Sequence, residues 1–138
     1  MTDANCIFCR IATGDIPSAK IYEDENVLAF LDLAPVHPGH TLVIPKNHYK
    51  DMLEVPAELG PAVFAALQKV AGAVVKATGA QGFNIMQNNG LAAGQTMFHI
   101  HWHIIPRFDD DGLAMWAQGK YSDAAAMQEM AASVASYL

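Results

Sequence analysis

Charged residues are scarce in this chain. Only 16% of its 138 residues are Asp, Glu, Lys or Arg, and 14 acidic residues outnumber 8 basic ones, which gives a net charge of −6. Such a surface does not attract DNA, RNA or anionic membranes over a broad area, so we expect no nucleic-acid and no membrane partner. A small anionic ligand bound at one local site remains compatible with this charge.

The chain also lacks the segments that direct proteins out of the cytoplasm. Residues 1–5 contain neither the basic nor the apolar stretch of a secretory signal, and no run approaches the ~18 apolar residues that span a bilayer. We therefore expect a cytoplasmic protein. Cysteine is rare as well, with only Cys6 and Cys9, and in that compartment the pair favours thiols or metal ligands over a disulfide.

Apolar residues, in contrast, make up 52% of the chain, which excludes a disordered protein. The length suits one domain, and no repeat, low-complexity tract or linker divides residues 1–138.

Periodicity and turn residues predict the order of the elements. Apolar residues at helical spacing indicate a long helix over 56–78, with Gly79 as its stop. Asp24 and Glu25 indicate a hairpin turn. The remaining expectations are a short helix over 6–14, strands over 19–23, 26–31, 40–44, 82–88 and 98–105, a loop over 46–54, a turn over 109–112, and a helix over 123–136 capped by Ser122. Together they predict an α+β fold with a mostly antiparallel sheet, one long central helix and a C-terminal helix.

Six histidines are present, and three of them alternate with large apolar residues in the segment 99–105. In a strand this alternation places His99, His101 and His103 on one face and the apolar residues in the core. Neighbouring imidazoles ~6.6 Å apart cannot all be charged at low cost, so their pKa values should diverge. A solvated edge, a three-histidine metal site and covalent catalysis by an imidazole on a phosphoryl group are all compatible with this row.

The loop before this row favours the phosphoryl chemistry. Residues 90–96 read Gly-Leu-Ala-Ala-Gly-Gln-Thr, and they provide two glycines, an amide and a hydroxyl. Glycine lets backbone N–H groups approach an anion closely, and the polar side chains can donate to phosphate oxygens.

These segments resemble the histidine-triad (HIT) family of nucleotide hydrolases and transferases. The resemblance rests on the histidine row at 99–105, on Asn88-Asn89-Gly90 and Gly94-Gln95-Thr96, and on the segments 29–32 and 38–46. It covers roughly residues 6–107 and leaves 108–138 as a variable C-terminal extension of a single HIT domain.

The resemblance implies the family's α+β fold, with its sheet extended across a homodimer. It implies a hydrolase in which an imidazole attacks the α-phosphate of a nucleotide, and water then releases the nucleoside monophosphate. Family substrates include adenosine phosphoramidates, aminoacyl adenylates and dinucleoside polyphosphates, so we expect a purine nucleotide and no organic cofactor. Two rival functions remain: a nucleotide-binding scaffold with little turnover, and a metallohydrolase that uses the three histidines as ligands.

By position, the resemblance makes His101 the nucleophile, oriented by the carbonyl of His99 or a neighbouring backbone group. His103 and His40 lie by the phosphate, and the Thr96 hydroxyl assists the leaving group. Asp32 accepts hydrogen bonds from the ribose, and Asn88 contacts ribose or phosphate. The other expected contacts are Gly94 and Gln95 with the phosphate, and Ile7, Phe8, Ile11, Phe30 and Leu33 with the base.

Several of these residues have simpler explanations. Asp32 could only end a strand, His40 could cap a turn, and the aromatic residues could be ordinary core. His37 matches no family position and reads as a loop histidine. Met115 and Trp116 could reach a site across the dimer or serve only in packing.

The Cys6-Ile7-Phe8-Cys9 segment is half of a tetrahedral zinc site, whose other ligands would be histidines because no second cysteine pair exists. The resemblance to a zinc-containing branch of the family implies the set Cys6, Cys9, His48 and His99, with a structural role for zinc. Two reduced thiols without a metal are the alternative.

Overall fold

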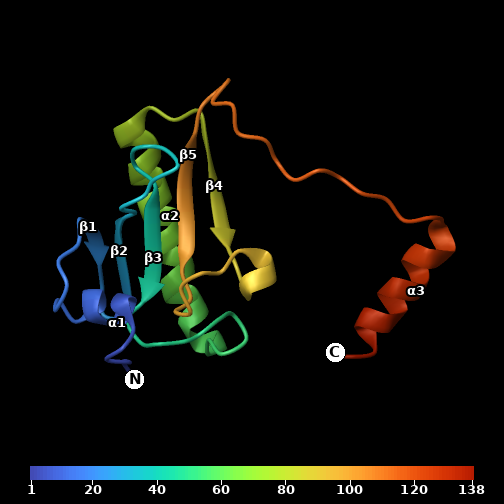
Figure 1. Ribbon diagram of the computed structural model, residues 1–138, viewed down its shortest axis with the longest axis horizontal. Helices are drawn as coiled ribbons and strands as arrows, with labels where there is room; N and C mark the ends of the chain where they lie inside the picture. The colour runs from blue at the N-terminus through green and yellow to red at the C-terminus, as the bar shows by residue number, and fades with distance from the viewer.

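The computed structural model describes residues 1–138 as one body and one detached C-terminal segment (Figure 1). Its elements in chain order are α1 (Ile7–Ala12), β1 (Lys20–Glu23), β2 (Val27–Leu31), β3 (Thr41–Pro45), a 3₁₀ turn (Ala57–Leu59), α2 (Gly60–Thr78), β4 (Gly82–Gln87), a second 3₁₀ turn (Leu91–Ala93), β5 (Trp102–Arg107) and α3 (Ala124–Ala135).

The five strands form one sheet in the order β1-β2-β3-β5-β4, and every neighbouring pair is antiparallel. The turn between β1 and β2 is closed by Asp24, whose carboxylate accepts the backbone N–H groups of Asn26 and Val27. This arrangement confirms the predicted α+β fold.

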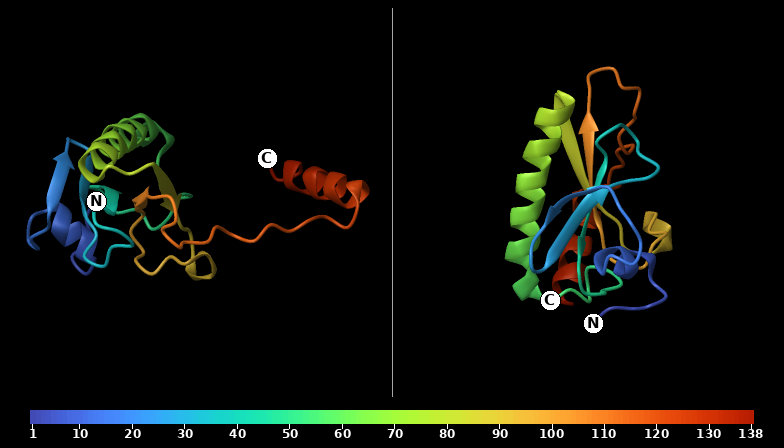
Figure 2. Two further views of the ribbon diagram at one scale, coloured as in Figure 1. Left: turned by 90° about the horizontal axis from the view of Figure 1, so that it is seen from above. Right: turned by 90° about the vertical axis from the view of Figure 1, so that its left-hand side faces the viewer.

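The core has two layers because β2 and β3 are buried on both faces (Figure 2). Val27, Ala29 and Val43 belong to the cluster under α2, whereas Leu28 and Phe30 belong to a smaller cluster under α1. Side chains alternate between faces along a strand, so a continuous apolar run supplies both layers.

Helix α2 packs its apolar row on the sheet and ends where glycine was expected. Gly79 adopts φ +69°, the left-handed conformation typical of a helix C-terminus. By length and composition alone, the segment Ala57–Thr78 would be long and apolar enough to cross a membrane. Its buried residues nevertheless face the sheet, as in a core helix.

Strand β5 begins later than predicted, at Trp102 rather than near residue 98. His99 to His101 are irregular, and the Ile100 N–H donates to the Tyr49 carbonyl at 2.7 Å instead of a neighbouring strand. Pro106 was expected to close the strand, but β5 continues to Arg107. Strand β3 pairs with β5 only as far as Ile104, so at Pro106 only β4 lies alongside.

The C-terminal helix is capped by Asp123 and not by Ser122 as predicted. The Asp123 carboxylate accepts the Ala126 N–H at 2.7 Å, which satisfies a free donor of the first turn. No residue of α3 is buried, and the helix lies well beyond β4 in Figures 1 and 2.

Candidate functional site

The histidine row lies on the face of the sheet opposite α2. Ile100, Trp102 and Ile104 are buried in the cluster under α2, as the alternation predicted. His99, His101 and His103 are therefore turned to the α1 side, where the row divides between two adjacent sites.

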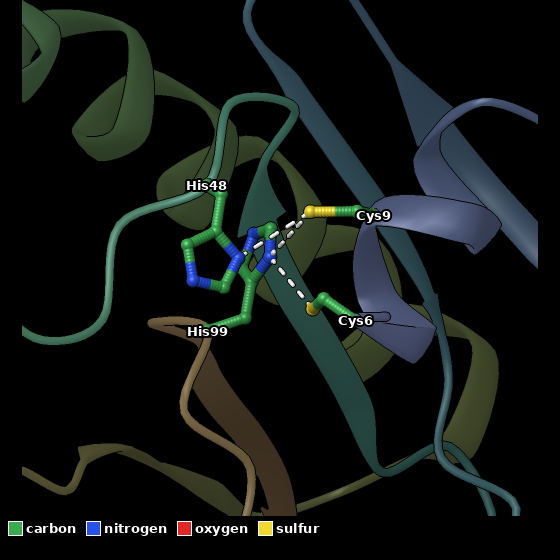
Figure 3. A group of neighbouring side chains, drawn as sticks. All are labelled: Cys6, Cys9, His48 and His99. Carbon is green, nitrogen blue, oxygen red and sulfur yellow. Dashed lines mark hydrogen bonds between the residues drawn. The ribbon is translucent and has the colours of Figure 1, made fainter. Parts of the chain in front are cut away.

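The first site is a Cys/His cluster made of Cys6, Cys9, His48 and His99 (Figure 3). Both thiols come from the start of α1, His48 follows β3, and His99 precedes β5. The Nδ1 atom of His99 lies 3.4 Å from each sulfur, and the Nδ1 atom of His48 lies 3.4 Å from the Cys9 sulfur.

These four side chains fit a tetrahedral metal ion. Metal–sulfur bonds near 2.3 Å and metal–nitrogen bonds near 2.0–2.1 Å place tetrahedral ligand atoms about 3.5 Å apart, close to the observed separations. All four ligand atoms lie within 4.8 Å of one another. Two cysteines and two histidines also form a closed set, which is typical of structural sites.

The groups around the cluster support the same assignment. His99 donates its Nε2–H to the Pro45 carbonyl at 2.9 Å, which leaves the Nδ1 lone pair directed at the sulfurs. Burial lowers the pKa of His99 to about 4, so the ring is in the neutral, ligating form at neutral pH. The Asp3 N–H donates to the Cys9 sulfur at 3.3 Å, whereas burial raises the pKa of that thiol.

The second site is a cavity of about 330 Å³ beside the Cys/His cluster. It is mostly apolar, with Asp32, His101 and His103 as its main polar groups. Its lining residues are Ile7, Phe8, Ile11, Ile16, Pro17, Ser18, Ala19, Phe30, Leu31, Asp32, Leu33, Leu42, Thr96, Met97, His101 and His103. An apolar slot with a few convergent polar groups is typical of a small-molecule site.

His101 is held in one orientation at the wall of this cavity. Its Nδ1–H donates to the carbonyl of His99 at 2.8 Å, and the ring of Phe8 packs edge-on at 5.2 Å between centroids. With Nδ1 protonated, the lone pair of the neutral ring is on Nε2. The backbone bond to His99 is the one that the family resemblance implied.

His40 and His103 form a hydrogen-bonded pair next to His101. The Val36 N–H donates to His40 Nδ1 at 3.1 Å, so His40 carries its proton on Nε2, which lies 2.9 Å from His103 Nδ1. His103 then accepts at Nδ1 and carries its own proton on Nε2. Its ring centroid lies 4.9 Å from that of His101.

Burial keeps this pair neutral. It lowers the pKa of His103 to about 4, with further lowering from His101 and His40, and it also lowers the pKa of His40. The carboxylate of Asp32, 3.6 Å from His40 Nε2, acts in the opposite direction. The pKa values of His99 and His103 thus both fall to about 4, mainly through desolvation, and do not diverge from each other as expected.

Backbone geometry in the preceding turn delivers His40 to this position. Gly39 has φ +98°, and a Cβ atom there would lie 2.6 Å from Cγ2 of Thr78 at the end of α2. Only glycine fits both the conformation and the close approach.

The structure brings most of the expected residues to the cavity but not the whole phosphate loop. Asn88, Gly94 and Gln95 are absent from the cavity wall, and His40 reaches the site through His103. The Gln95 side chain is fully buried, accepts from the Gly90 N–H and donates to the carbonyls of Lys50 and Met97. These bonds give Gln95 a role in shaping the loop.

Sequence reasoning missed part of the wall, namely Ile16, Pro17, Ser18, Ala19, Leu31, Leu42 and Met97. The first four belong to an irregular segment between α1 and β1, for which no periodicity gives a signal. It also missed a partner for His37, whose ring lies 3.2 Å from the Asp111 carboxylate.

A larger hollow of about 630 Å³ is also lined by residues of the Cys/His cluster, namely Cys6 and His48. Its polar lining includes Asp3, Lys50 and Glu54, and none of the three aligned histidines reaches it. Of these two cavities, only the smaller one is bordered by His101 and His103.

Comparison with known proteins places these features in a family. The HIT domain model matches residues 13–110. The Bacillus subtilis protein hit is 54% identical over 114 residues, covering 81% of this chain and 79% of the relative. Adenosine 5'-monophosphoramidase hnt1 of Schizosaccharomyces pombe is 44% identical over 107 residues, covering 78% and 77%. Adenylylsulfatase HINT3 of Arabidopsis thaliana is 45% identical over 113 residues, covering 82% and 56%.

Solved structures of similar proteins indicate the same family. A HIT family protein from Bacillus subtilis superposes with a TM-score of 0.90 at 46% identity, covering 97% of both chains. A Streptococcus mutans protein gives 0.93 at 43% identity, covering 99% of this chain and 87% of its own. A Zn-bound histidine triad family protein from Mycobacterium smegmatis gives 0.76 at 40% identity, covering 97% and 98%. The fold, the histidine row and these matches together show that the chain belongs to the HIT family.

Proposed function

We propose that this chain is a hydrolase that acts on the α-phosphate of purine nucleotide conjugates through a covalent nucleotidyl–histidine intermediate. The relatives named adenosine 5'-monophosphoramidase and adenylylsulfatase support nucleotide hydrolysis as the reaction class. The orientation of His101 is the observation that carries the proposal, because its Nδ1–H bond to the His99 carbonyl directs the free lone pair to Nε2.

In the first step, Nε2 of His101 forms a bond to the α-phosphorus, and the bond between phosphorus and the leaving group breaks. A proton passes to the leaving group from the His103 Nε2–H or from the Thr96 hydroxyl, both of which border the cavity. In the second step, water attacks phosphorus and gives a proton back to the group that donated one in the first step, the phosphorus–nitrogen bond breaks, and nucleoside monophosphate is released. His101 regains its lone pair and the cycle closes.

The remaining lining residues are suited to the nucleoside. Asp32 is a partly buried carboxylate at the cavity rim, and both of its oxygens could accept ribose hydroxyl protons. Phe8, Ile11, Phe30 and Leu33 provide the apolar slot for the base. Asn88, Gly94 and Gln95 remain proposed phosphate contacts, for which the loop would have to move toward the cavity.

We also propose that the Cys/His cluster binds zinc in a structural role. Bound zinc would cross-link α1, the segment after β3 and the start of β5, and the donor set and spacing of Cys6, Cys9, His48 and His99 support it. The name of the Zn-bound Mycobacterium smegmatis relative supports the same metal. The residues of this chain that move protons lie outside the cluster.

The proposed active form is a homodimer in which the sheet continues from one copy to the next. Strand β4 is an edge strand, and Phe83 and Ile85 on it are exposed. An exposed edge with apolar side chains is a natural surface for pairing with a second strand.

A hydrolysis panel tests the proposed function. The protein is offered an adenosine phosphoramidate, a diadenosine polyphosphate and their guanosine counterparts, and nucleoside monophosphate release is followed by chromatography. We expect turnover of at least one class, with competitive inhibition by the monophosphate. Tight monophosphate binding with negligible turnover across the panel would instead identify a nucleotide-binding scaffold.

A further inference from the structure

The hollow of about 630 Å³ adjoins the cavity to which the proposed chemistry is assigned. Ile7, Thr96 and Met97 line both the hollow and the smaller cavity of about 330 Å³, so the two spaces share part of their walls. The nucleoside and the α-phosphate are assigned to the smaller cavity, which leaves the hollow without a role. A substrate that extends past the shared wall would enter the hollow.

The shared wall contains a residue that the proposed reaction uses. The Thr96 hydroxyl is one of the two proposed proton donors to the leaving atom, so that atom has to come within hydrogen-bond distance of it. The attacking and leaving groups lie roughly in line at phosphorus, which puts the leaving group on the far side of phosphorus from His101. Because Thr96 borders both spaces, the remainder of a large leaving group would extend into the hollow.

The charges that line the hollow are unequal. Asp3 and Glu54 each contribute a carboxylate and Lys50 contributes an ammonium group, which gives a net charge of −1 at neutral pH. Cys6 and His48 also line the hollow. In a zinc-bound cluster the two cysteine thiolates would cancel the charge of the metal ion, so the cluster would add no net charge.

Both carboxylates are held by the backbone and keep one oxygen free. Oδ1 of Asp3 accepts the Asn5 N–H at 2.9 Å, and Oε2 of Glu54 accepts the Lys50 N–H at 2.8 Å. Neither carboxylate takes part in an ion pair within the chain. The second oxygen of each is therefore available to an ammonium group of a bound molecule.

The single lysine of the hollow does not neutralise these carboxylates. Nζ of Lys50 lies 5.9 Å from the centroid of the Phe98 ring, within the range of a cation–π contact. It forms no ion pair with Asp3 or Glu54. The excess negative charge of the hollow therefore stays available for a ligand.

We infer that the hollow is the leaving-group subsite of the proposed hydrolase and that it selects amines whose far end is positively charged. The carbon chain of such an amine packs on Ile7, Met97 and Phe98, and its terminal ammonium group binds the carboxylates of Asp3 and Glu54. A polyphosphate leaving group would instead bring several negative charges to a hollow that already has an excess of them. The inference rests on the proposed hydrolase and goes beyond it, because it names the residues that choose the leaving group.

Three adenosine phosphoramidates that differ only at the far end of the amine chain test this inference. They are made from hexylamine, hexamethylenediamine and aminohexanoate, whose far ends are neutral, positive and negative. In each hydrolysis the phosphorus–nitrogen bond breaks, the amine nitrogen gains a proton, and the oxygen of water ends on phosphorus. The wild type should show a kcat/KM about 10-fold higher for the positive end than for the negative end, with the neutral end between them, as exposed ion pairs allow.

Substitutions that change one charge at a time should move this ratio in opposite directions. Asp3→Asn/Glu54→Gln removes both negative charges and keeps an oxygen for each backbone N–H, so the double variant should prefer the negative end. Lys50→Gln should increase the preference for the positive end by about 3-fold. Glu25→Gln is the matched control, because Glu25 is exposed in the turn between β1 and β2 and lines neither space; it should leave the ratio unchanged.

The unsubstituted adenosine phosphoramidate separates a failure of the subsite from a failure of the proposed function. Equal kcat/KM for the three chain ends, or a preference that persists in the double variant, would overturn the subsite and leave the hydrolase standing. Turnover of the unsubstituted substrate alone would do the same. No turnover of any of the four compounds would refute the proposed function and, with it, the subsite.

Discussion

The two histidine sites share one row of residues but use opposite ring atoms. His99 donates from Nε2 to the Pro45 carbonyl and directs Nδ1 into the buried Cys/His cluster, whereas His101 donates from Nδ1 to the His99 carbonyl and leaves Nε2 free at the open cavity. A single backbone acceptor for each ring would thus separate the proposed metal-binding role of His99 from the proposed nucleophilic role of His101. Identical side chains two residues apart acquire different chemistry from the partner of their second nitrogen.

Replacing one histidine from each site should separate the two roles most clearly. His101→Ala should lower kcat for nucleotide hydrolysis at least about 10⁴-fold, because the nucleophile is lost, with little change in the melting temperature. His48→Ala should instead lower the melting temperature and leave kcat close to wild type below the unfolding transition. Parallel rate measurements and thermal scans check both, and a reversed pattern would contradict the division of roles.

His103 should have the next largest effect on the rate. His103→Asn removes the Nε2–H that we assign to leaving-group protonation, so kcat should fall by about 10²–10³-fold. Substrates whose leaving groups need no proton should be affected much less. An equal loss for good and poor leaving groups would remove His103 from that role.

Metal removal should change stability more than chemistry. A chelator, or Cys9→Ser, should lower the free energy of unfolding by about 3 kcal/mol or more, which corresponds to roughly 10 °C in melting temperature for a domain of this size. Elemental analysis of the untreated protein should find about one zinc per chain. Turnover that vanishes on chelation while the fold persists would favour the metallohydrolase instead.

The smallest expected effect is on the pH dependence of stability. The pKa of His103 in the folded protein is lowered to about 4, below the ordinary value of 6.5, so the unfolded chain binds a proton over that interval and the folded chain does not. Stability should therefore fall as the pH drops from 6.5 toward 4, by on the order of 1 kcal/mol for this residue. Denaturant titrations should show a shallower slope for His103→Asn, and an unchanged slope would refute burial as the cause.

Much of the fold follows from local sequence signals. The long helix ends at Gly79 as predicted, and the alternation at 99–105 assigns the apolar residues to the correct face of the sheet. The start of β5 could not be predicted, because it depends on the bond from Ile100 to the distant Tyr49 carbonyl. The same holds for the 16–19 segment of the cavity wall and for the His37–Asp111 contact, which tertiary packing brings together.

The candidate sites, like the fold, could be predicted only in part from the sequence. The residue types and their family positions indicated which side chains gather in the Cys/His cluster and part of those that line the cavity, but they also placed Asn88, Gly94 and Gln95 there, and these three are absent from its wall. The tautomers did not follow from the sequence, since they depend on the carbonyls of Pro45 and His99 and on the Val36 N–H. The internal bonding of Gln95 was equally hidden, because the carbonyl of Lys50, which accepts from its side chain, lies on a distant segment of the chain.

The central claim is that His101, and no other residue in the row, becomes covalently bonded to the substrate. Rapid acid-free quenching of the protein with adenosine phosphoramidate, followed by peptide mass spectrometry, tests it directly. The account predicts an adenylyl group on the peptide that carries the row, with fragmentation assigning it to His101, and no such adduct in His101→Ala. Turnover with no adduct at any quench time, or an adduct on His103 or His40, would contradict it.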